Sequence, residues 1–250
     1  MEINCTAKEL FLLKKIANAA ASLNLETYVI GGFVRDKLLG RPTKDADIVC
    51  VGDGIQLAHA VAERFSPKPP VAFYKNFGTA AIRIDDLEVE FVGARKESYR
   101  YHSRNPEVQP GTLEEDQLRR DFTINALAVS LNEADYGRLV DPFNGKQDLE
   151  QKIIRTPLDP GQTFSDDPLR MLRAIRFASQ LNFTIEDSTW KGICAHVERI
   201  RIISQERITE ELNKILLSDK PSIGFDLLYK AGLLHIIFPP LVDLAGAEYI

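Results

Sequence analysis

The sequence predicts an α+β fold in which a mixed β-sheet with flanking helices precedes a region built of helices alone. Short β-branched segments alternate with helical patterns over the first 148 residues. From Leu149 onward strand signals nearly vanish and helical spacing of apolar residues dominates. We therefore expect one domain over 1–148 and a helical domain over 149–218.

The first half opens with a capping box. Thr6-Ala-Lys-Glu9 has the required spacing, and apolar residues follow at helical intervals, which predicts a helix over 7–22. A buried strand over 27–30 ends at Gly31-Gly32. The other elements expected in this half are helices over 33–39 and 54–65 and strands over 46–51, 79–84 and 89–92.

The second half shows four helical patterns, over 167–181, 188–197, 204–217 and 223–231. Between the halves, the segment 98–112 is polar, contains Pro and Gly, and is long for a connection. Such composition and length are typical of a mobile functional loop or of local disorder.

Composition narrows the function classes. The chain has 31 basic and 36 acidic residues, and a formal net charge of −5 provides no global positive field for a polyanion. Any contact with RNA must therefore be local. The three cysteines are odd in number and far apart, and no stretch reaches the ~20 apolar residues that a bilayer requires. We expect a cytoplasmic protein with no membrane partner.

Asp45 and Asp47 are the candidate metal ligands. They are separated by one residue and lead into the expected strand, so both side chains point to the same side of it. Two carboxylates placed in this way can share Mg²⁺. Taken alone, the same pair is more simply interpreted as a solvated acidic turn.

A glycine pair precedes these carboxylates. Gly31 and Gly32 lie where a strand leads into a helix, and backbone without side chains can approach a phosphate there. Arg35, one turn later, can add a charge-assisted contact. A tight turn with no ligand is the alternative.

Four motifs, in this order, resemble the signature of class II CCA-adding tRNA nucleotidyltransferases and bacterial poly(A) polymerases. The first runs from Gly31 to Val49 and includes both the glycine pair and Asp45-Ala-Asp47. The others are Arg119-Arg120-Asp121-Phe-Thr-Ile-Asn125-Ala126, Asp141-Pro-Phe-Asn-Gly145-Lys-Gln-Asp-Leu149 and Asp167-Pro-Leu-Arg170-Met-Leu-Arg173-Ala-Ile-Arg176-Phe177.

The resemblance implies a nucleotidyltransferase head over 1–148, a nucleotide-selecting neck over 149–218 and the start of a truncated helical body over 219–250. The implied activity is template-independent addition of C or A from CTP and ATP to the 3′ end of tRNA, with pyrophosphate released. It implies two Mg²⁺ ions, one held by Asp45 and Asp47 and a second that neutralises charge on the triphosphate, and no DNA partner.

Further site residues follow from the resemblance. Glu90 matches a third acid of the family, although a solvent-facing strand glutamate explains it equally well. Arg120 matches a nucleotide contact, and Asp121 matches an acid near the ribose. We expect Arg119, Arg120 and Asp121 to begin a helix; without the resemblance, an exposed, salt-bridged helix end is the alternative for these three residues.

Asp167 and Arg170 match the pair that selects the nucleotide. Three residues apart on an expected helix, they share a face, where Asp167 can accept from an exocyclic amine and Arg170 can donate. Cytosine and adenine both present an amino group beside an acceptor, which such a pair would favour over uracil and guanine. Arg173 and Arg176 continue toward the expected triphosphate. A helix end stabilised by acidic residues is the alternative.

The motifs do not separate CCA addition from CC addition, A addition or poly(A) synthesis. A different class of function is a noncatalytic fragment that binds nucleotide or RNA without the surface needed to hold tRNA.

Overall fold

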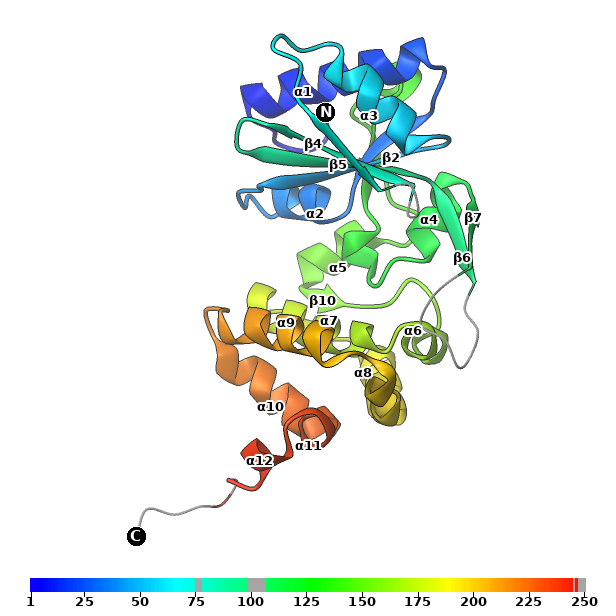
Figure 1. Cartoon of the computed structure of the whole chain (residues 1–250). Helices are drawn as coiled ribbons and strands as arrows, with labels where there is room; N and C mark the ends of the chain where they lie inside the picture. The colour runs from blue at the N-terminus through cyan, green and yellow to red at the C-terminus, as the bar shows by residue number, and fades with distance from the viewer. Residues whose placement is uncertain (75–77, 99–106, 245, 247–250) are drawn as a thin grey trace. The chain divides into compact units, whose positions relative to one another are not determined.

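The computed structural model describes residues 1–74, 78–98, 107–244 and 246. The chain divides into two compact units, the first formed by 1–97 with 108–149 and the second by 98–107 with 150–250. The predicted α+β class is confirmed, because the first unit contains a mixed sheet and the second is mainly helical (Figure 1).

A seven-stranded sheet, in the order β3-β4-β5-β2-β1-β8-β9, forms the centre of the first unit. Strands β2 and β5 are parallel, whereas their other neighbours pair in antiparallel fashion. The strands of this unit are β1 (Thr27–Ile30), β2 (Asp45–Cys50), β3 (Val71–Tyr74), β4 (Thr79–Ile84), β5 (Leu87–Gly93), β8 (Ala128–Ser130) and β9 (Leu139–Val140), with β6 (Arg95–Ser98) and β7 (Glu107–Pro110) forming a separate pair.

Helices cover both faces of this sheet. Helices α1 and α3 lie over one face and α2 lies on the other (Figure 1). The capping box at the start of α1 forms as predicted, since Glu9 N donates to Thr6 Oγ1 at 3.3 Å and Thr6 N donates to Glu9 Oε2 at 2.8 Å. The helices of the unit are α1 (Ala7–Ser22), α2 (Gly32–Leu38), α3 (Gly54–Ala62), α4 (Leu113–Leu118) and α5 (Gly145–Gln151), with short 3-10 turns at Thr123–Asn125 and Glu133–Asp135.

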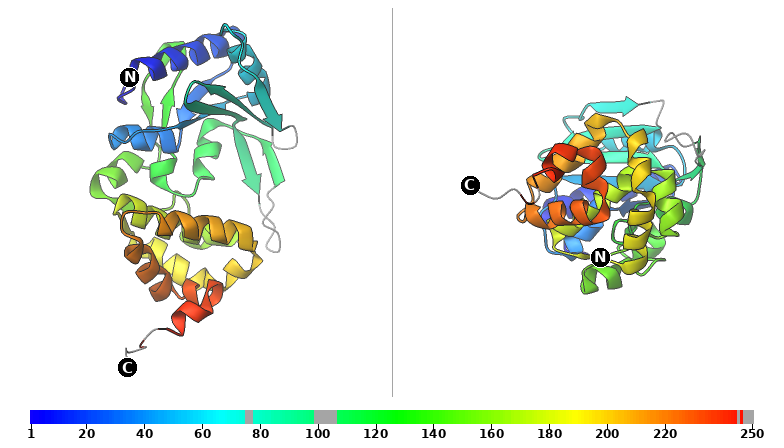
Figure 2. Two further views of the ribbon diagram at one scale, coloured as in Figure 1. Left: turned by 60° about the vertical axis from the view of Figure 1, so that its left-hand side comes forward. Right: turned by 90° about the horizontal axis from the view of Figure 1, so that it is seen from below.

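The second unit packs α7 against α9 and α10 (Figure 2). Its four predicted helices are confirmed, although the first begins two residues later and the fourth two residues earlier than expected. The elements are β10 (Ile153–Ile154), α6 (Pro160–Asp166), α7 (Leu169–Leu181), β11 (Thr184–Ile185), α8 (Asp187–His196), a 3-10 turn at Val197–Ile202, α9 (Gln205–Leu216), α10 (Pro221–Ala231), α11 (Leu233–Ile237) and α12 (Pro239–Val242).

The segment predicted as a long polar loop, 98–112, lies partly outside the described residues. At its ends the chain forms β7 and the last residue of β6, which the sequence analysis did not predict. No helix in the described part of the chain is long and apolar enough to cross a membrane.

Candidate active site

Strand β2 carries the two predicted carboxylates on one face of the sheet. Asp45 and Asp47 alternate with Ala46 and Ile48, which are 2% and 0% exposed. Because alternate residues of a strand point to opposite faces, the carboxylates project away from this core. Asp45 is exposed and Asp47 is partly buried.

Glu90 lies beside Asp47. Strands β2 and β5 run parallel, with Asp47 paired to Glu90 and Asp45 paired to Glu88. Neighbouring residues in such a pair project to the same face. The structure therefore brings three of the predicted acids together and adds Glu88, which the sequence analysis did not single out.

The electrostatics of this face reflect burial and crowding of negative charge. Burial is the main cause that raises the pKa of Asp47; the guanidinium of Arg120 opposes it, and the charges of Asp45 and Asp116 add to it. Burial and the charge of Asp47 likewise raise the pKa of Glu90. A bound cation would relieve this crowding.

These carboxylates fit a Mg²⁺ site completed by other ligands. Within the residues that the structure describes, no group of three or more His, Cys, Asp or Glu side chains is arranged to hold a metal ion. Mg²⁺ commonly takes one or two carboxylates and completes its shell with water and substrate phosphates. Asp45 and Asp47 match that donor set.

Gly31 forms a notch beside Asp47. Its φ of +81° lies in the left-handed region, and a Cβ placed there would be 2.8 Å from Arg120 Nη1 and 3.3 Å from Asp47 Oδ2. Its N–H donates to the Leu127 carbonyl at 3.0 Å. Only glycine combines this conformation with such close approach, and Gly32 begins α2 directly after it.

Arg35 is engaged by protein groups. Its Nη1 donates to Asn125 Oδ1 at 2.7 Å, and its Nε and Nη2 donate to the two oxygens of Asp36, each at 2.9 Å. Its side chain is 11% exposed. These contacts tie α2 to the segment after α4, and phosphate binding by Arg35 remains a prediction.

Arg119, Arg120 and Asp121 do not begin a helix, so this prediction is wrong. Helix α4 begins earlier, at a capping box formed by Thr112 and Glu115, and Arg119 is its C-cap. Arg120 and Asp121 follow in the segment that leads to the 3-10 turn Thr123–Asn125. The capping box, which is the stronger signal for the start of a helix, lies before the two arginines in the sequence.

Asp121 is a buried acceptor in this segment. Its Oδ1 accepts from Phe122 N at 2.8 Å and from Asn125 Nδ2 at 3.0 Å. The same Asn125 side chain accepts from Arg35. One amide therefore joins the motif that begins at Gly31 to the motif that begins at Arg119. Asn125 belongs to the motif Arg119–Ala126 but was not predicted as a site residue.

Asp116 is a functional candidate that the sequence analysis missed. It is 0% exposed and accepts from both Arg119 and Arg120. Its separation from the arginines, three and four residues, is the spacing at which helical side chains meet, which is the signal that can find it.

In the second unit, Asp167 and Arg170 do not share one helix. Asp167 follows the last residue of α6 with extended φ and ψ of −133° and 98°, and Arg170 lies in the first turn of α7. The cause is Pro168, because a residue before proline is disfavoured in helical conformation. The two residues remain joined, since Arg170 N donates to the Asp167 carbonyl at 3.0 Å.

The Asp167 carboxylate also supports the start of α7. Its Oδ1 accepts from Leu169 N at 3.1 Å, and Oδ2 lies 3.4 Å from Arg207 Nη2. Arg170 is 9% exposed. The alternative of a carboxylate that stabilises a helix end therefore has direct support, and it is compatible with a second role for Asp167.

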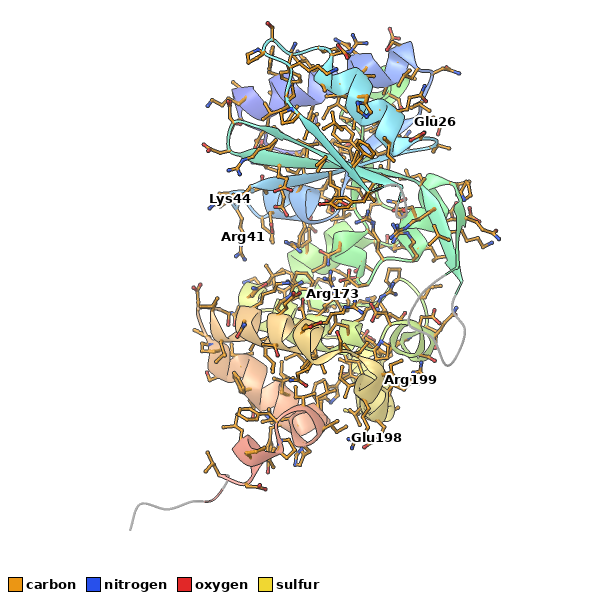
Figure 3. All side chains as sticks on the ribbon, in the orientation of Figure 1. Glu26, Arg41, Lys44, Arg173, Glu198 and Arg199 are labelled. Atoms are coloured by element: carbon orange, nitrogen blue, oxygen red, sulfur yellow. The ribbon has the colours of Figure 1, made fainter. Side chains whose placement is uncertain are left out.

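Arg173 and Arg176 differ in their surroundings. Arg176 is buried, pairs through Nε with Glu211 Oε2 at 3.0 Å and stacks on Phe177, with 4.2 Å from Cζ to the ring centre. Arg173 is partly buried on the same helix (Figure 3). Of the two, Arg173 is therefore the more accessible, and nucleotide contact by either remains a prediction.

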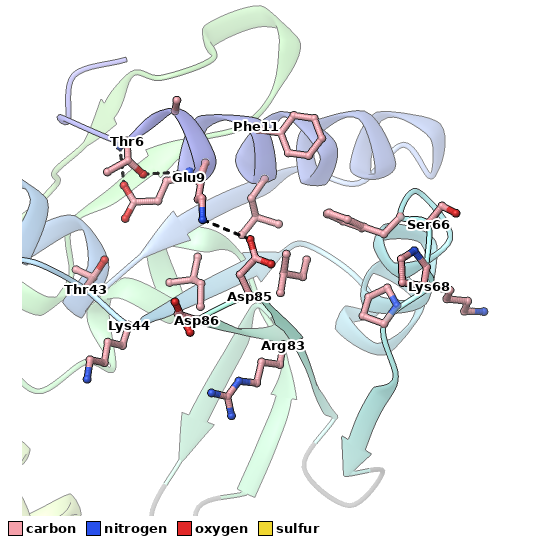
Figure 4. Close-up of a pocket in the computed structure, with 18 of the residues that line it drawn as sticks. Thr6, Glu9, Phe11, Thr43, Lys44, Ser66, Lys68, Arg83, Asp85 and Asp86 are labelled. Carbon is pink, nitrogen blue, oxygen red and sulfur yellow. Dashed lines mark hydrogen bonds and ion pairs between the residues drawn. The ribbon is translucent and has the colours of Figure 1, made fainter.

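A separate pocket of about 860 Å³ opens in the first unit (Figure 4). The start of α1, the turn between β4 and β5, and the segment 65–70 surround it. Phe11 and Phe65 meet edge to face in its wall, with ring centres 6.4 Å apart. None of the residues predicted to bind nucleotide or metal lines this pocket.

A mixed sheet that presents paired carboxylates beside a glycine notch has the arrangement of a nucleotidyltransferase head, and the comparisons with known proteins agree with it. Residues 27–155 match the family described as the Poly A polymerase head domain, and residues 182–244 match the probable RNA and SrmB-binding site of polymerase A. The chain belongs to the Poly A polymerase head domain family.

Relatives with assigned activities support this membership. The A-adding tRNA nucleotidyltransferase of Aquifex aeolicus is 42% identical over 200 residues, covering 77% of this chain and 24% of the relative. The A-adding enzyme of Halalkalibacterium halodurans is 36% identical, covering 91% and 54%. The chain thus spans about a quarter and about half of the lengths of these two relatives.

Solved structures show the same fold. A tRNA nucleotidyltransferase complexed with a primer tRNA and an incoming ATP analogue superposes with a TM-score of 0.78 and 35% sequence identity. The match covers 94% of this chain and 64% of that one. The predicted resemblance to nucleotidyltransferases is confirmed.

Proposed function

We propose that this chain catalyses template-independent addition of C or A from CTP or ATP to the 3′ end of tRNA. The observation that carries the proposal is the juxtaposition of Asp47, Gly31 and Arg120, where a carboxylate, an open backbone notch and a guanidinium meet. The nucleotide and tRNA named in the related complex support the choice of substrates.

In the proposed reaction the 3′-hydroxyl of the RNA attacks the α-phosphorus of the nucleoside triphosphate. The new bond joins O3′ to that phosphorus, the bond to the bridging oxygen of the β-phosphate breaks, pyrophosphate leaves, and the proton of the hydroxyl is released to water. Asp45 and Asp47 would hold Mg²⁺, which when bound lowers the pKa of the hydroxyl and neutralises charge on the triphosphate.

The residues of the chain itself bind and orient the nucleotide. The notch at Gly31 allows a phosphate to approach the backbone, and Arg120 supplies positive charge beside it. Glu90, next to Asp47, adds a third carboxylate to the same face. In the second unit, Asp167 and Arg170 select the base, and Arg173 and Arg176 contribute positive charge, with Arg35 and Asp121 as further contacts in the first unit.

Incubation of the chain with Mg²⁺ and tRNA lacking its terminal CCA, with labelled CTP and ATP given separately and together, tests this function. Ordered incorporation of C, then A, identifies CCA addition. Incorporation of C alone, of A onto tRNA ending in CC, or of long A tails identifies the CC-adding, A-adding or poly(A) variant.

A second candidate is a fragment that binds nucleotide without transferring it. The observation in its favour is that the chain spans 24% and 54% of the lengths of the two relatives. Binding of CTP without incorporation into any of these RNAs would support the fragment and contradict the proposed activity.

A further inference from the structure

We propose that Asp116 is a positioning residue that holds the guanidinium of Arg120 beside Gly31 and keeps it off Asp47. The inference rests on the proposed function, because it assigns Asp116 a role in preparing the site for metal and nucleotide. It concerns a residue that touches neither of them.

Each oxygen of the Asp116 carboxylate accepts hydrogen bonds from a different arginine. Oδ1 accepts from Arg119 through Nε at 3.0 Å and Nη2 at 2.6 Å. Oδ2 accepts from Arg120 through Nε at 3.4 Å and Nη2 at 3.3 Å. One buried carboxylate thus orients two guanidinium groups, and its position in the last turn of α4 fixes it to the fold.

The Nη1 atom of Arg120 points away from Asp116, toward Gly31. Its Nη1 donates to the Asn125 carbonyl at 3.4 Å and lies 2.8 Å from the position a Gly31 Cβ would occupy. Asp47 Oδ2 is 3.3 Å from that same position. Yet Arg120 forms no ion pair with Asp47 in the described part of the chain, because Asp116 and Asn125 hold it on either side.

The carboxylates of Asp116 and Asp47 therefore compete for the guanidinium of Arg120. Without the charge of Asp116, the guanidinium of Arg120 can turn to Asp47, whose Oδ2 faces the same notch at Gly31 and which is one of the two expected Mg²⁺ ligands. An arginine paired with Asp47 would oppose a metal ion there by charge and by occupation. Asp116 therefore keeps Asp47 available to the metal and Arg120 available to a phosphate.

The test compares equilibrium binding in the whole chain. Mn²⁺, followed by the electron paramagnetic resonance signal of the free ion, reports the metal site without substrate, and calorimetry with CTP and Mg²⁺ reports the nucleotide. We expect Asp116→Asn to weaken Mn²⁺ binding about fivefold and CTP binding about tenfold. Glu114→Gln, an exposed acid of the same helix, is the matched control and should change neither.

The decisive variant combines Asp116→Asn with Arg120→Gln. Removing the competing guanidinium should restore Mn²⁺ affinity to within twofold of the wild type, while CTP binding stays weak. A lesion that only loosens the fold would be deepened by the second substitution. Failure of the double variant to recover Mn²⁺ affinity, or unchanged affinities in Asp116→Asn, would overturn the inference.

If circular dichroism shows that Asp116→Asn does not fold, Asp116→Glu replaces it. The added methylene keeps the charge but displaces both oxygens, so CTP affinity should fall in a folded protein, and an unchanged affinity would overturn the inference. Because the readouts are binding affinities, a wild-type chain that binds Mn²⁺ and CTP but incorporates no nucleotide contradicts the proposed function alone. The Asp116 comparison then still decides the inference.

Discussion

Asp47 on β2 and Glu90 on β5 are direct neighbours in the parallel strand pair at the centre of the sheet. Their carboxylates project from the same face, and burial together with mutual repulsion raises the pKa of Glu90. The fold thus keeps negative charges together that repel one another without a cation. Crowding of this kind is typical of sites organised for a ligand rather than for stability.

Gly31→Ala should abolish nucleotide binding. The substitution costs about 1–2 kcal/mol of stability for the positive φ, and the new methyl group would displace Arg120 Nη1, 2.8 Å away. Gly40→Ala is a matched control, since Gly40 has a φ of +68° with no atom within 4 Å of the added carbon. Calorimetry with CTP should show loss of binding in Gly31→Ala alone, and equal binding in both variants would refute the notch.

Asp47→Asn should raise the melting temperature of the metal-free protein at neutral pH. Burial, with the charges of Asp45 and Asp116 and against that of Arg120, raises the pKa of Asp47 above its ordinary value of 3.8. A raised folded-state pKa means that stability present in acid is lost as pH rises through that pKa. Melting curves in EDTA across a pH series should show a weaker decline for Asp47→Asn, and a lower melting temperature for this variant at pH 7 would contradict the explanation.

Lys37→Met should destabilise the first unit by about 3 kcal/mol, because it leaves a carboxylate buried without its counter-charge. Lys37 Nζ lies 2.6 Å from Glu9 Oε1, and the two side chains are 8% and 11% exposed. Lys8→Met is the control, since Lys8 is 86% exposed and lies 3.9 Å from Asp85. Chemical denaturation measures both, and equal stability of the two variants would show that burial adds nothing to the Glu9–Lys37 pair.

The same ion pair should make stability fall in acid. Burial acts to raise the pKa of Glu9, but hydrogen bonds from Lys37 and Thr6 hold it below its ordinary value of 4.5. A lowered folded-state pKa contributes stability that is present at neutral pH and lost as pH falls through that pKa. The loss of stability as pH falls below about 4.5 should be smaller in Glu9→Gln than in the wild type, and identical pH profiles would count against the assignment.

Asp167→Asn should relax the choice between CTP and UTP. The amide retains an oxygen that can accept from Leu169 N, so the start of α7 is preserved, but its NH₂ group can face the carbonyl of uracil. We expect the ratio of kcat/KM for CTP over UTP to fall at least tenfold. Asp166→Asn, the adjacent carboxylate, should leave the ratio unchanged, and equal ratios in both variants would restrict Asp167 to a structural role.

Local signals with one strong physical cause were predictable from the sequence. The capping box at Thr6 and Glu9 predicted the bounds of α1, and alternation around Asp45 and Asp47 predicted the face on which both carboxylates lie. Strand β3 was not predicted, because its aromatic residues Phe73 and Tyr74 are exposed on an edge strand. A pattern of buried residues is absent there.

The parts of the site that depend on tertiary structure were not predictable. The family resemblance pointed to Glu90, but no pattern in the sequence indicated that β5 pairs with β2 and places Glu90 beside Asp47. Asp116 was missed because its importance depends on where α4 ends and on the burial of its carboxylate. The start of α7 was predicted two residues too early, because the acidic residues before Pro168 also fit the first turn of a helix.

If Asp45 and Asp47 carry metal-dependent nucleotidyl transfer, their substitution should slow single-turnover incorporation of labelled CTP into tRNA lacking its terminal CCA. After incorporation by the wild-type chain is established, Asp45→Asn and Asp47→Asn should each reduce the rate by at least ~100-fold, equivalent to several kcal/mol of transition-state stabilisation. Circular dichroism should show an unchanged fold in both variants. A rate within threefold of the wild type in either folded variant would show that this aspartate does not carry the reaction.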